Sequence, residues 1–160
     1  MIKVGDRLPE ATFRVMTEKG PEPRTTAEIF GGKKVVLFGV PGAFTPTCHQ
    51  NHLPGYLANA EALKAKGVDE IAVTAVNDPF VMKAWAESTG GMGKITYLSD
   101  GSAEFAQAAG LALDLTARGL GMRNQRFSML VDDGVVKALN VEAVAGQVET
   151  TGADSLLNQI

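Results

Sequence analysis

Cys48 is the only cysteine of the chain, and it stands in the stretch FGVPGAFTPTCHQNHLPGY, residues 38–56. Both histidines, His49 and His52, follow it closely, and three prolines and two threonines share the stretch. A thiol in such a setting can serve as a nucleophile, bind a metal or fill space in a core. The chemistry of this chain therefore depends on what surrounds Cys48.

The position of Cys48 favours a thiolate over a buried, inert thiol. A short β-branched apolar run at residues 34–40 predicts a strand buried on both faces, and a helical period begins beyond Pro46. Cys48 then falls on the first turn of a helix, where unpaired backbone N–H groups and the helix dipole stabilise negative charge. Cysteines in such positions, next to a cation, ionise at about pH 3.5–7.5, whereas a free thiol ionises near about 8.5.

Two other chemistries would use the neighbouring histidines. Cys48 and His52, at positions i and i+4, could share a helix face and bind zinc, with His49 beside them. Zinc takes three or four protein ligands, and the chain has no further cysteine or histidine, so we expect no metal. A cysteine hydrolase needs a base oriented by a third group, for which only Asn51 is at hand. We interpret His52 as a helix-surface or packing histidine.

Thr45 precedes Cys48 by three residues, so TPTC resembles a redox CxxC motif in which a hydroxyl replaces the first thiol. A hydroxyl cannot close a disulfide, but it can form a hydrogen bond to the sulfur or to an incoming oxygen. Thr45 also suits the N-cap of the following helix, and the two roles are compatible. Pro41 and Pro46 stiffen the loop, either to keep bulk water from the thiol or because prolines are common between a strand and a helix.

Apolar periodicity predicts the elements that position this stretch. Further strands are expected at residues 71–76 and 95–98, and two β-rich runs joined by an Asp-Gly turn predict a hairpin at 126–139. A short helix is predicted after the capping box Thr25–Glu28, and a longer one from Pro46 to Gly67 with a kink at Pro54. Further helices are predicted over 79–87, with Asp78 as N-cap, and over 102–110 and 153–160. Residues 18–24 are predicted to form a surface turn. This order predicts an α/β, thioredoxin-like fold, with a central mixed β-sheet flanked by helices and an N-terminal extension.

Composition excludes several classes of function. The 160 residues suit a single domain, residues 1–160, and 45% hydrophobic with 21% charged residues allow a substantial core. A net charge of −3 gives no reason to expect a basic surface that would bind nucleic acid, and it does not favour binding to an anionic membrane. No apolar run approaches the roughly 20 residues of a membrane span, and the N-terminus lacks the apolar region of a signal peptide. One cysteine suits a reducing compartment, and we expect a cytoplasmic protein.

The motif PGAFTPTC, Pro41–Cys48, matches the pattern P-x-x-x-T-x-x-C of peroxiredoxin active sites. The segments HLPG, VNDPFVMKAW and RFSMLVDDGVVKALNVE resemble the peroxiredoxin 5 subfamily, also called type II peroxiredoxins, and the similarity runs from about Val4 to the C-terminus. The resemblance implies a thiol peroxidase that reduces hydrogen peroxide and alkyl hydroperoxides without a cofactor. Cys48 would be the peroxidatic cysteine, Thr45 would form a hydrogen bond to the peroxide, and Pro41 would shield the thiolate.

Two arginines, Arg123 and Arg126, are candidates for the cation that stabilises the thiolate. Arg126 matches the family's active-site arginine, whose charge would stabilise the thiolate and orient the peroxide. Arg123 stands three residues earlier, and the residues alone do not choose between them, because either could be a solvated charge at a strand end. The resemblance selects Arg126.

The chain departs from the family where several members carry a second cysteine, because Val73 and Thr150 stand at those positions. A sulfenic acid on Cys48 therefore cannot close an internal disulfide, and an external thiol, either glutathione with glutaredoxin or thioredoxin, would have to reduce it. The resemblance also implies a homodimer with Phe80 and Trp85 near the contact, although both could equally be core aromatics. The alternative functions are a peroxide sensor or relay that oxidises a client protein, and a thioredoxin-like binding module with an inert thiol.

Overall fold

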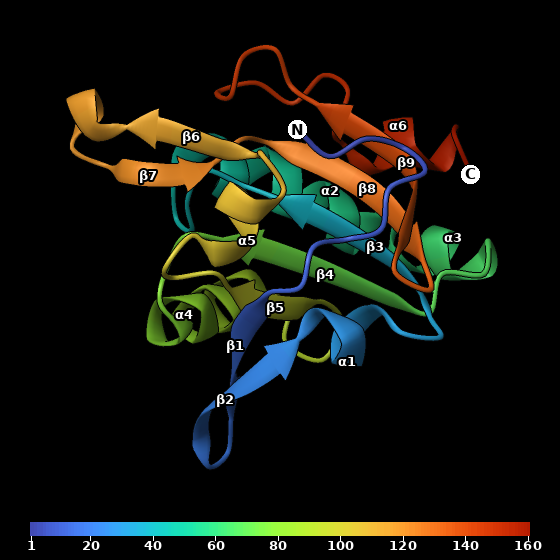
Figure 1. The fold of residues 1–160 in the computed structure, drawn as a ribbon, viewed down its shortest axis with the longest axis horizontal. Helices are drawn as coiled ribbons and strands as arrows, with labels where there is room; N and C mark the ends of the chain where they lie inside the picture. Colours follow the sequence, from blue (N-terminus) through green and yellow to red (C-terminus); the bar gives the residue numbers. More distant parts are fainter.

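The computed structural model describes all residues from 1 to 160, and a seven-stranded mixed sheet forms its centre (Figure 1). The strand order is β2-β1-β5-β4-β3-β8-β9, with β3, β4 and β5 parallel and the other neighbours antiparallel; β6 and β7 form a separate pair. The strands are β1 (Thr12–Thr17), β2 (Gly20–Thr25), β3 (Lys34–Gly39), β4 (Glu70–Ala75), β5 (Thr96–Ser99), β6 (Ala112–Leu115), β7 (Gly121–Asn124), β8 (Phe127–Asp132) and β9 (Val135–Val141).

Helices cover both faces of this sheet, as the thioredoxin-like fold prediction requires. They are α1 (Thr26–Phe30), the π-helical turn η1 (Cys48–His52), α2 (Leu53–Ala58), α3 (Ala60–Ala65), α4 (Pro79–Thr89), α5 (Glu104–Ala108), the 3₁₀ turn η2 (Thr116–Arg118) and α6 (Ala153–Leu157). None of them combines the length and the apolar character needed to cross a membrane.

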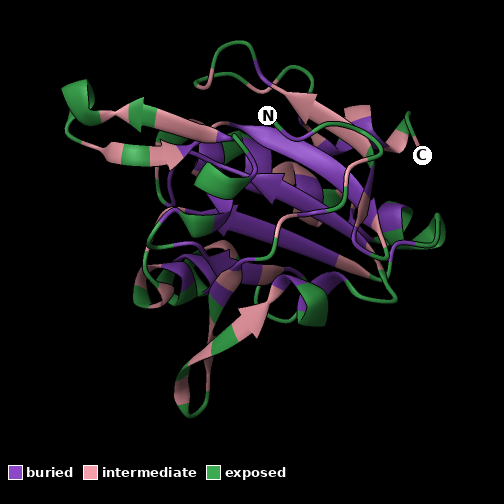
Figure 2. Ribbon diagram, viewed as in Figure 1, coloured by how far each residue is buried: buried purple, intermediate pink, exposed green.

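Two apolar cores lie on opposite sides of the sheet. Residues of η1, α2, α3, α4 and α6 contribute to one core of 21 buried residues, and α1, α5 and the N-terminal segment contribute to the other, of 17. Alternate residues of β3 face the two cores, with Val36 and Phe38 in the first and Val35 and Leu37 in the second. This two-sided burial explains the uninterrupted apolar run in the sequence, and Figure 2 shows the central strands buried along most of their length.

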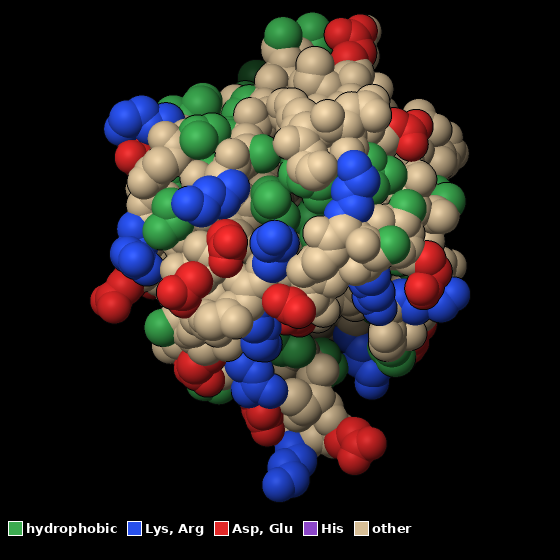
Figure 3. Space-filling view, turned by 90° about the vertical axis from the view of Figure 1, so that its right-hand side faces the viewer, with side chains coloured by type: hydrophobic (Ala, Val, Ile, Leu, Met, Phe, Trp, Pro, Cys, Tyr) green, Lys and Arg blue, Asp and Glu red, His purple; other side chains and the backbone are tan.

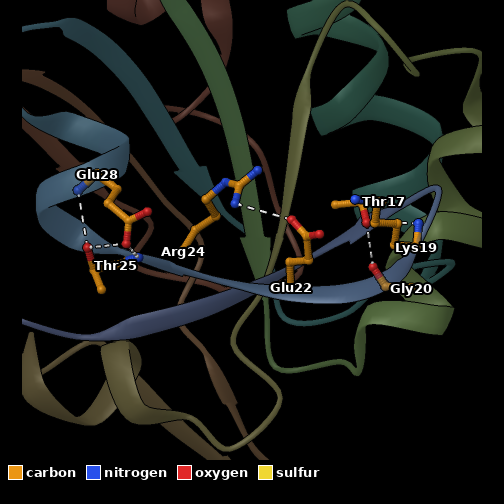
Figure 4. Close-up of polar contacts among 7 residues, drawn as sticks. All are labelled: Thr17, Lys19, Gly20, Glu22, Arg24, Thr25 and Glu28. Carbon is orange, nitrogen blue, oxygen red and sulfur yellow. Dashed lines mark hydrogen bonds and ion pairs between the residues drawn. The ribbon is translucent and has the colours of Figure 1, made fainter.

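Several local signals in the sequence are confirmed. The Thr25 hydroxyl accepts from the Glu28 N–H, and the Glu28 carboxylate accepts from the Thr25 N–H, which completes the capping box of α1 (Figure 4). The Asp78 carboxylate accepts from the Val81 N–H at 2.8 Å and caps α4. Asp133 and Gly134 both have positive φ, 48° and 81°, so they form the tight turn of the β8–β9 hairpin.

The sequence predicts a surface turn at residues 18–24, but most of these residues belong to β2. This strand forms an edge of the sheet and carries Pro21 and Pro23, which have no N–H to donate and are therefore tolerated there. The β1–β2 hairpin projects from the body, with the Thr17 hydroxyl donating to the Gly20 carbonyl at its turn (Figures 1 and 4). Neither β1 nor the β6–β7 pair is among the strands predicted from the sequence.

Two predicted helices differ in detail. The helix after Pro46 is interrupted at Asn59, so the predicted single helix to Gly67 becomes η1, α2 and α3. The brief helix predicted from Ser102 begins at Glu104, and its first N–H groups donate to the buried Asp100 carboxylate. On the face shown in Figure 3, Lys and Arg side chains are interspersed with Asp and Glu, without a continuous basic patch.

Candidate active site

Cys48 lies where the chain leaves the end of β3 and enters a helix. The His49 N–H donates to the Thr45 carbonyl at 2.9 Å, which marks the first helical turn, and the Leu53 N–H donates to the Cys48 carbonyl in a wider π-helical turn. Pro54 accounts for this widening, because proline has no N–H and its ring would clash with the carbonyl four residues earlier in a regular helix. The predicted irregularity at Pro54 is thus a π-turn that contains the thiol, a feature frequent at functional sites.

The cation next to the thiol is Arg126. Its Nη2 lies 2.9 Å from the Cys48 Sγ, and both residues are buried. Arg126 immediately precedes β8, and the register of that strand against β3, Gly39 opposite Phe127, brings it to the end of β3 that leads into the Cys48 loop. Arg126 forms no ion pair with a carboxylate. A buried cation without a carboxylate partner favours an anionic sulfur beside it.

Arg123 lies elsewhere, so the structure separates the two arginines. Its Nη1 donates to the Pro41 carbonyl at 3.1 Å and its Nε donates to the Leu120 carbonyl at 2.8 Å. Gly42 accommodates this side chain, because a Cβ at that position would lie 2.6 Å from Arg123 Nη1. Arg123 therefore connects β7 to the active-site loop, whereas the hydrogen bond to the sulfur comes from Arg126.

Thr45 and Pro41 line a pocket of about 190 Å³ together with Arg126, Leu115 and Leu120. The Thr45 hydroxyl donates to the Gly42 carbonyl at 2.7 Å and does not cap the following helix with its side chain. Because its proton is committed to that carbonyl, its oxygen is left to accept a hydrogen bond from a bound molecule. The predicted residues Pro41, Thr45 and Arg126 thus meet around one opening.

Of the two interpretations of His52, a helix-surface or a packing histidine, the first is wrong, because the side chain is buried. Its Nδ1 lies 2.9 Å from Arg126 Nη1, and its Nε2 lies 3.0 Å from the Thr151 carbonyl. An arginine N–H can only donate, so Nδ1 accepts and Nε2 carries the proton. Burial, and then the charge of Arg126, lower the pKa of His52 to about 3. His52 is therefore neutral at physiological pH.

Glu142 anchors the segment that closes this side of the site. Its carboxylate accepts from the backbone N–H groups of Glu149, Thr150 and Thr151 and from the Thr151 hydroxyl. Burial opposes its ionisation, but these hydrogen bonds hold the pKa of Glu142 below its ordinary value. In the same segment the Ala145 carbonyl accepts from Arg126 Nε at 2.8 Å. Glu142 and His52 both lie in segments that resemble the family, the last residue of RFSMLVDDGVVKALNVE and the first of HLPG, but neither residue was assigned a role in the site from the sequence.

The remaining predictions concern metals, thiols and aromatics. The Nδ1 of His49 accepts a hydrogen bond from Trp85 Nε1 at 3.0 Å, and no group of three or more His, Cys, Asp or Glu side chains is placed to hold a metal. Val73 is buried in β4. Trp85 is a core aromatic, whereas Phe80 is 64% exposed. The homodimer, the single domain and the cytoplasmic location stay predictions.

Comparison with known proteins supplies the family. Residues 3–157 match the family model described as Redoxin. The chain is 49% identical over 164 residues to peroxiredoxin-2E-2, chloroplastic, of Oryza sativa subsp. japonica, which covers 99% of this chain and 72% of that protein. It is 45% identical over 160 residues to peroxiredoxin-2B of Arabidopsis thaliana, across 99% and 98% of the two chains. The crystal structure of reduced Prx3 in complex with H2O2 from Vibrio vulnificus has a TM-score of 0.95 at 50% identity, over 99% of each chain.

The thioredoxin-like fold, the buried thiol beside an arginine and these relatives together define a thiol peroxidase. The chain belongs to the redoxin family and, within it, to the type II, peroxiredoxin 5-like peroxiredoxins, with a single cysteine.

Proposed function

We propose that this chain reduces hydrogen peroxide and alkyl hydroperoxides by forming a sulfenic acid on Cys48. The observation that carries the proposal is the 2.9 Å contact between Arg126 Nη2 and the Cys48 Sγ, next to the pocket that Pro41 and Thr45 line. A related peroxiredoxin from Vibrio vulnificus, 50% identical, is described in complex with H2O2, which supports peroxide as the substrate here.

In the first half-reaction, the Cys48 thiolate attacks one oxygen of the peroxide. A sulfur–oxygen bond forms, the oxygen–oxygen bond breaks, and the departing oxygen takes up a proton to leave as water or an alcohol. The Arg126 guanidinium holds the thiolate and stabilises charge on the oxygens, and Thr45 Oγ1 accepts from the O–H of the peroxide. Pro41 shields the thiolate from bulk water. Leu115 and Leu120 give the pocket an apolar wall, which suits alkyl as well as hydrogen peroxide.

In the second half-reaction, an external thiol must restore Cys48, because the chain has no other cysteine. The incoming thiol attacks the sulfenic sulfur and releases water, leaving a mixed disulfide. A second thiol then attacks this disulfide, returns Cys48 to the reduced form and leaves as an oxidised disulfide. Glutathione with glutaredoxin, or a thioredoxin, would supply these two thiols.

An NADPH-coupled peroxide assay tests the proposal with each reductant system in parallel. We expect many turnovers per chain with at least one system and none with Cys48→Ser, whose fold is checked by circular dichroism. Appreciable turnover by folded Cys48→Ser would sink the assignment of Cys48. Consumption of only about one equivalent of peroxide in both systems would favour the sensor or relay in place of the peroxidase.

A further inference from the structure

We propose that His52 is a positioning residue. Its neutral imidazole holds the Arg126 guanidinium against Cys48 and links that guanidinium to the segment 142–151, which Glu142 anchors. The inference rests on the proposed function of Cys48 and adds a residue that touches neither the sulfur nor the peroxide pocket. It arises from a continuous chain of contacts, in which Arg126 Nη2 meets the Cys48 Sγ, Arg126 Nη1 meets His52 Nδ1, and His52 Nε2 meets the Thr151 carbonyl.

The Thr151 carbonyl, at the far end of this series of contacts, is itself held in place. The Thr151 carbonyl also accepts from the Tyr56 hydroxyl at 2.7 Å, and the Thr151 N–H and hydroxyl both donate to the Glu142 carboxylate, at 2.9 and 2.6 Å. Thr151 is completely buried, so its carbonyl has no water to exchange with these partners. The imidazole of His52 is thus held by an acceptor that is itself held from three directions.

The imidazole ring is also held by packing. Its centroid lies 5.0 Å from that of Phe38 and 5.5 Å from that of Tyr56. The orientation of the ring is therefore set independently of Arg126, and its Nδ1 lone pair presents a fixed acceptor to the guanidinium. With the Ala145 carbonyl on Nε, this acceptor leaves Arg126 one position for Nη2, which is the position next to Cys48.

Packing alone does not require a histidine here. A leucine or phenylalanine would fill a buried, mostly apolar site, but it would leave Arg126 Nη1 without its acceptor inside the protein, which destabilises the placement of the cation. A protonated histidine would fail as well, because its Nδ1 would donate and its charge would repel Arg126. The groups that bear on the charge of His52 are Arg126, the Thr151 carbonyl and Glu142, with the Tyr56 ring packed against it, and burial keeps the imidazole neutral among them.

Two amide variants separate the two hydrogen bonds of His52, because each keeps a polar atom near only one of the ring nitrogens. In His52→Asn the side-chain oxygen occupies the position of Nδ1, so it keeps the contact with Arg126 and loses the one with Thr151. In His52→Gln the amide reaches the position of Nε2, so it keeps the contact with Thr151 and loses the one with Arg126. His49→Asn is the matched control, because His49 contacts Trp85 and lies outside the chain of contacts.

The readouts are the rate of peroxide reduction and, independently of it, the pH profile of Cys48 alkylation by iodoacetamide. We expect His52→Gln to lower the peroxide rate constant by about ten- to a hundredfold and to move the alkylation profile to higher pH, as loss of a hydrogen bond to a charged group predicts. His52→Asn should stay within about threefold of wild type in both, and His49→Asn should not differ from wild type. The alkylation profile tests His52 even if the protein turned over no peroxide, so failure of the proposed function is distinguishable.

Two results would overturn the proposal. One is that His52→Asn and His52→Gln have the same rates and alkylation profiles, either both impaired or both like wild type. Either case would mean that the hydrogen bond from Arg126 to His52 does not by itself affect the reactivity of Cys48. The other comes from the unaltered protein and does not depend on whether the variants fold: nitrogen-15 NMR that finds the ring proton of His52 on Nδ1.

Discussion

Acidification should destabilise the folded protein through His52. Burial lowers the pKa of this histidine to about 3 in the folded protein, from 6.5 for an unperturbed histidine. Between these two values the unfolded chain binds a proton that the folded protein does not bind. Lowering the pH in this range therefore favours unfolding, and the stability lost is regained as the pH rises to about 6.5.

The magnitude follows from the difference in proton binding. From about pH 7 to about pH 5, a histidine that ionises near 6.5 only when the chain unfolds costs the folded protein about 2 kcal/mol. Any folded pKa below about 4 gives almost the same loss over this range, because the imidazole stays neutral in the folded protein throughout. A loss of this size is a large part of the stability of an ordinary domain.

Urea unfolding at several pH values measures this loss, and His52→Asn isolates it. Glu142, whose pKa is held low, also loses stabilising effect in acid, whereas Asp100, whose pKa burial raises, acts in the opposite direction. These contributions cancel when the pH dependence of the variant is subtracted from that of wild type, leaving the expected loss of about 2 kcal/mol. If wild type and His52→Asn lose equal stability between these pH values, the reasoning is refuted.

Two further predictions concern the arginine and the sheet. Arg126→Met should slow peroxide reduction by about a hundredfold or more, because it removes the only cation in contact with Cys48; stopped-flow rates above about a tenth of wild type would contradict this role. Gly39→Ala should destabilise the fold by about 1–3 kcal/mol, because its Cβ would overlap the Phe127 ring. Urea unfolding checks this value, and an unchanged midpoint would show that the ring moves aside without cost.

The residues around the thiol were predictable because they are adjacent in sequence. Pro41, Thr45 and Cys48 lie within one strand-to-helix connection, so local patterning was sufficient to place them together. Arg126 was not accessible in this way, since Arg123 has the same chemistry and stands three residues away. The distinction comes from the register of β8 against β3, a contact between segments nearly 90 positions apart, which apolar periodicity does not specify.

The missed strands have a different cause. Residues 20–25 contain two prolines and a glycine, which are depleted in strands in general, and only their edge position makes them compatible with one. The β6–β7 pair is short, and its strands are largely half-buried or exposed, so it carries no strong apolar alternation. Propensity identified the central strands, where the apolar pattern is continuous, and the turn signal identified the β8–β9 hairpin; the partly exposed strands β1, β2, β6 and β7 were missed.

His52 could not be recognised from sequence because its role depends on a carbonyl 99 residues away and on a π-turn of the backbone. Electrostatics explains why a neutral imidazole, and not a carboxylate, suits this position. A carboxylate in this place would also accept from Arg126, but it would neutralise the buried guanidinium and remove the electrostatic preference for a thiolate at Cys48. A neutral acceptor fixes the orientation of the cation without cancelling its charge. The uncompensated charge of Arg126 and the uncharged state of His52 are therefore two parts of one arrangement, and both direct negative charge to the sulfur.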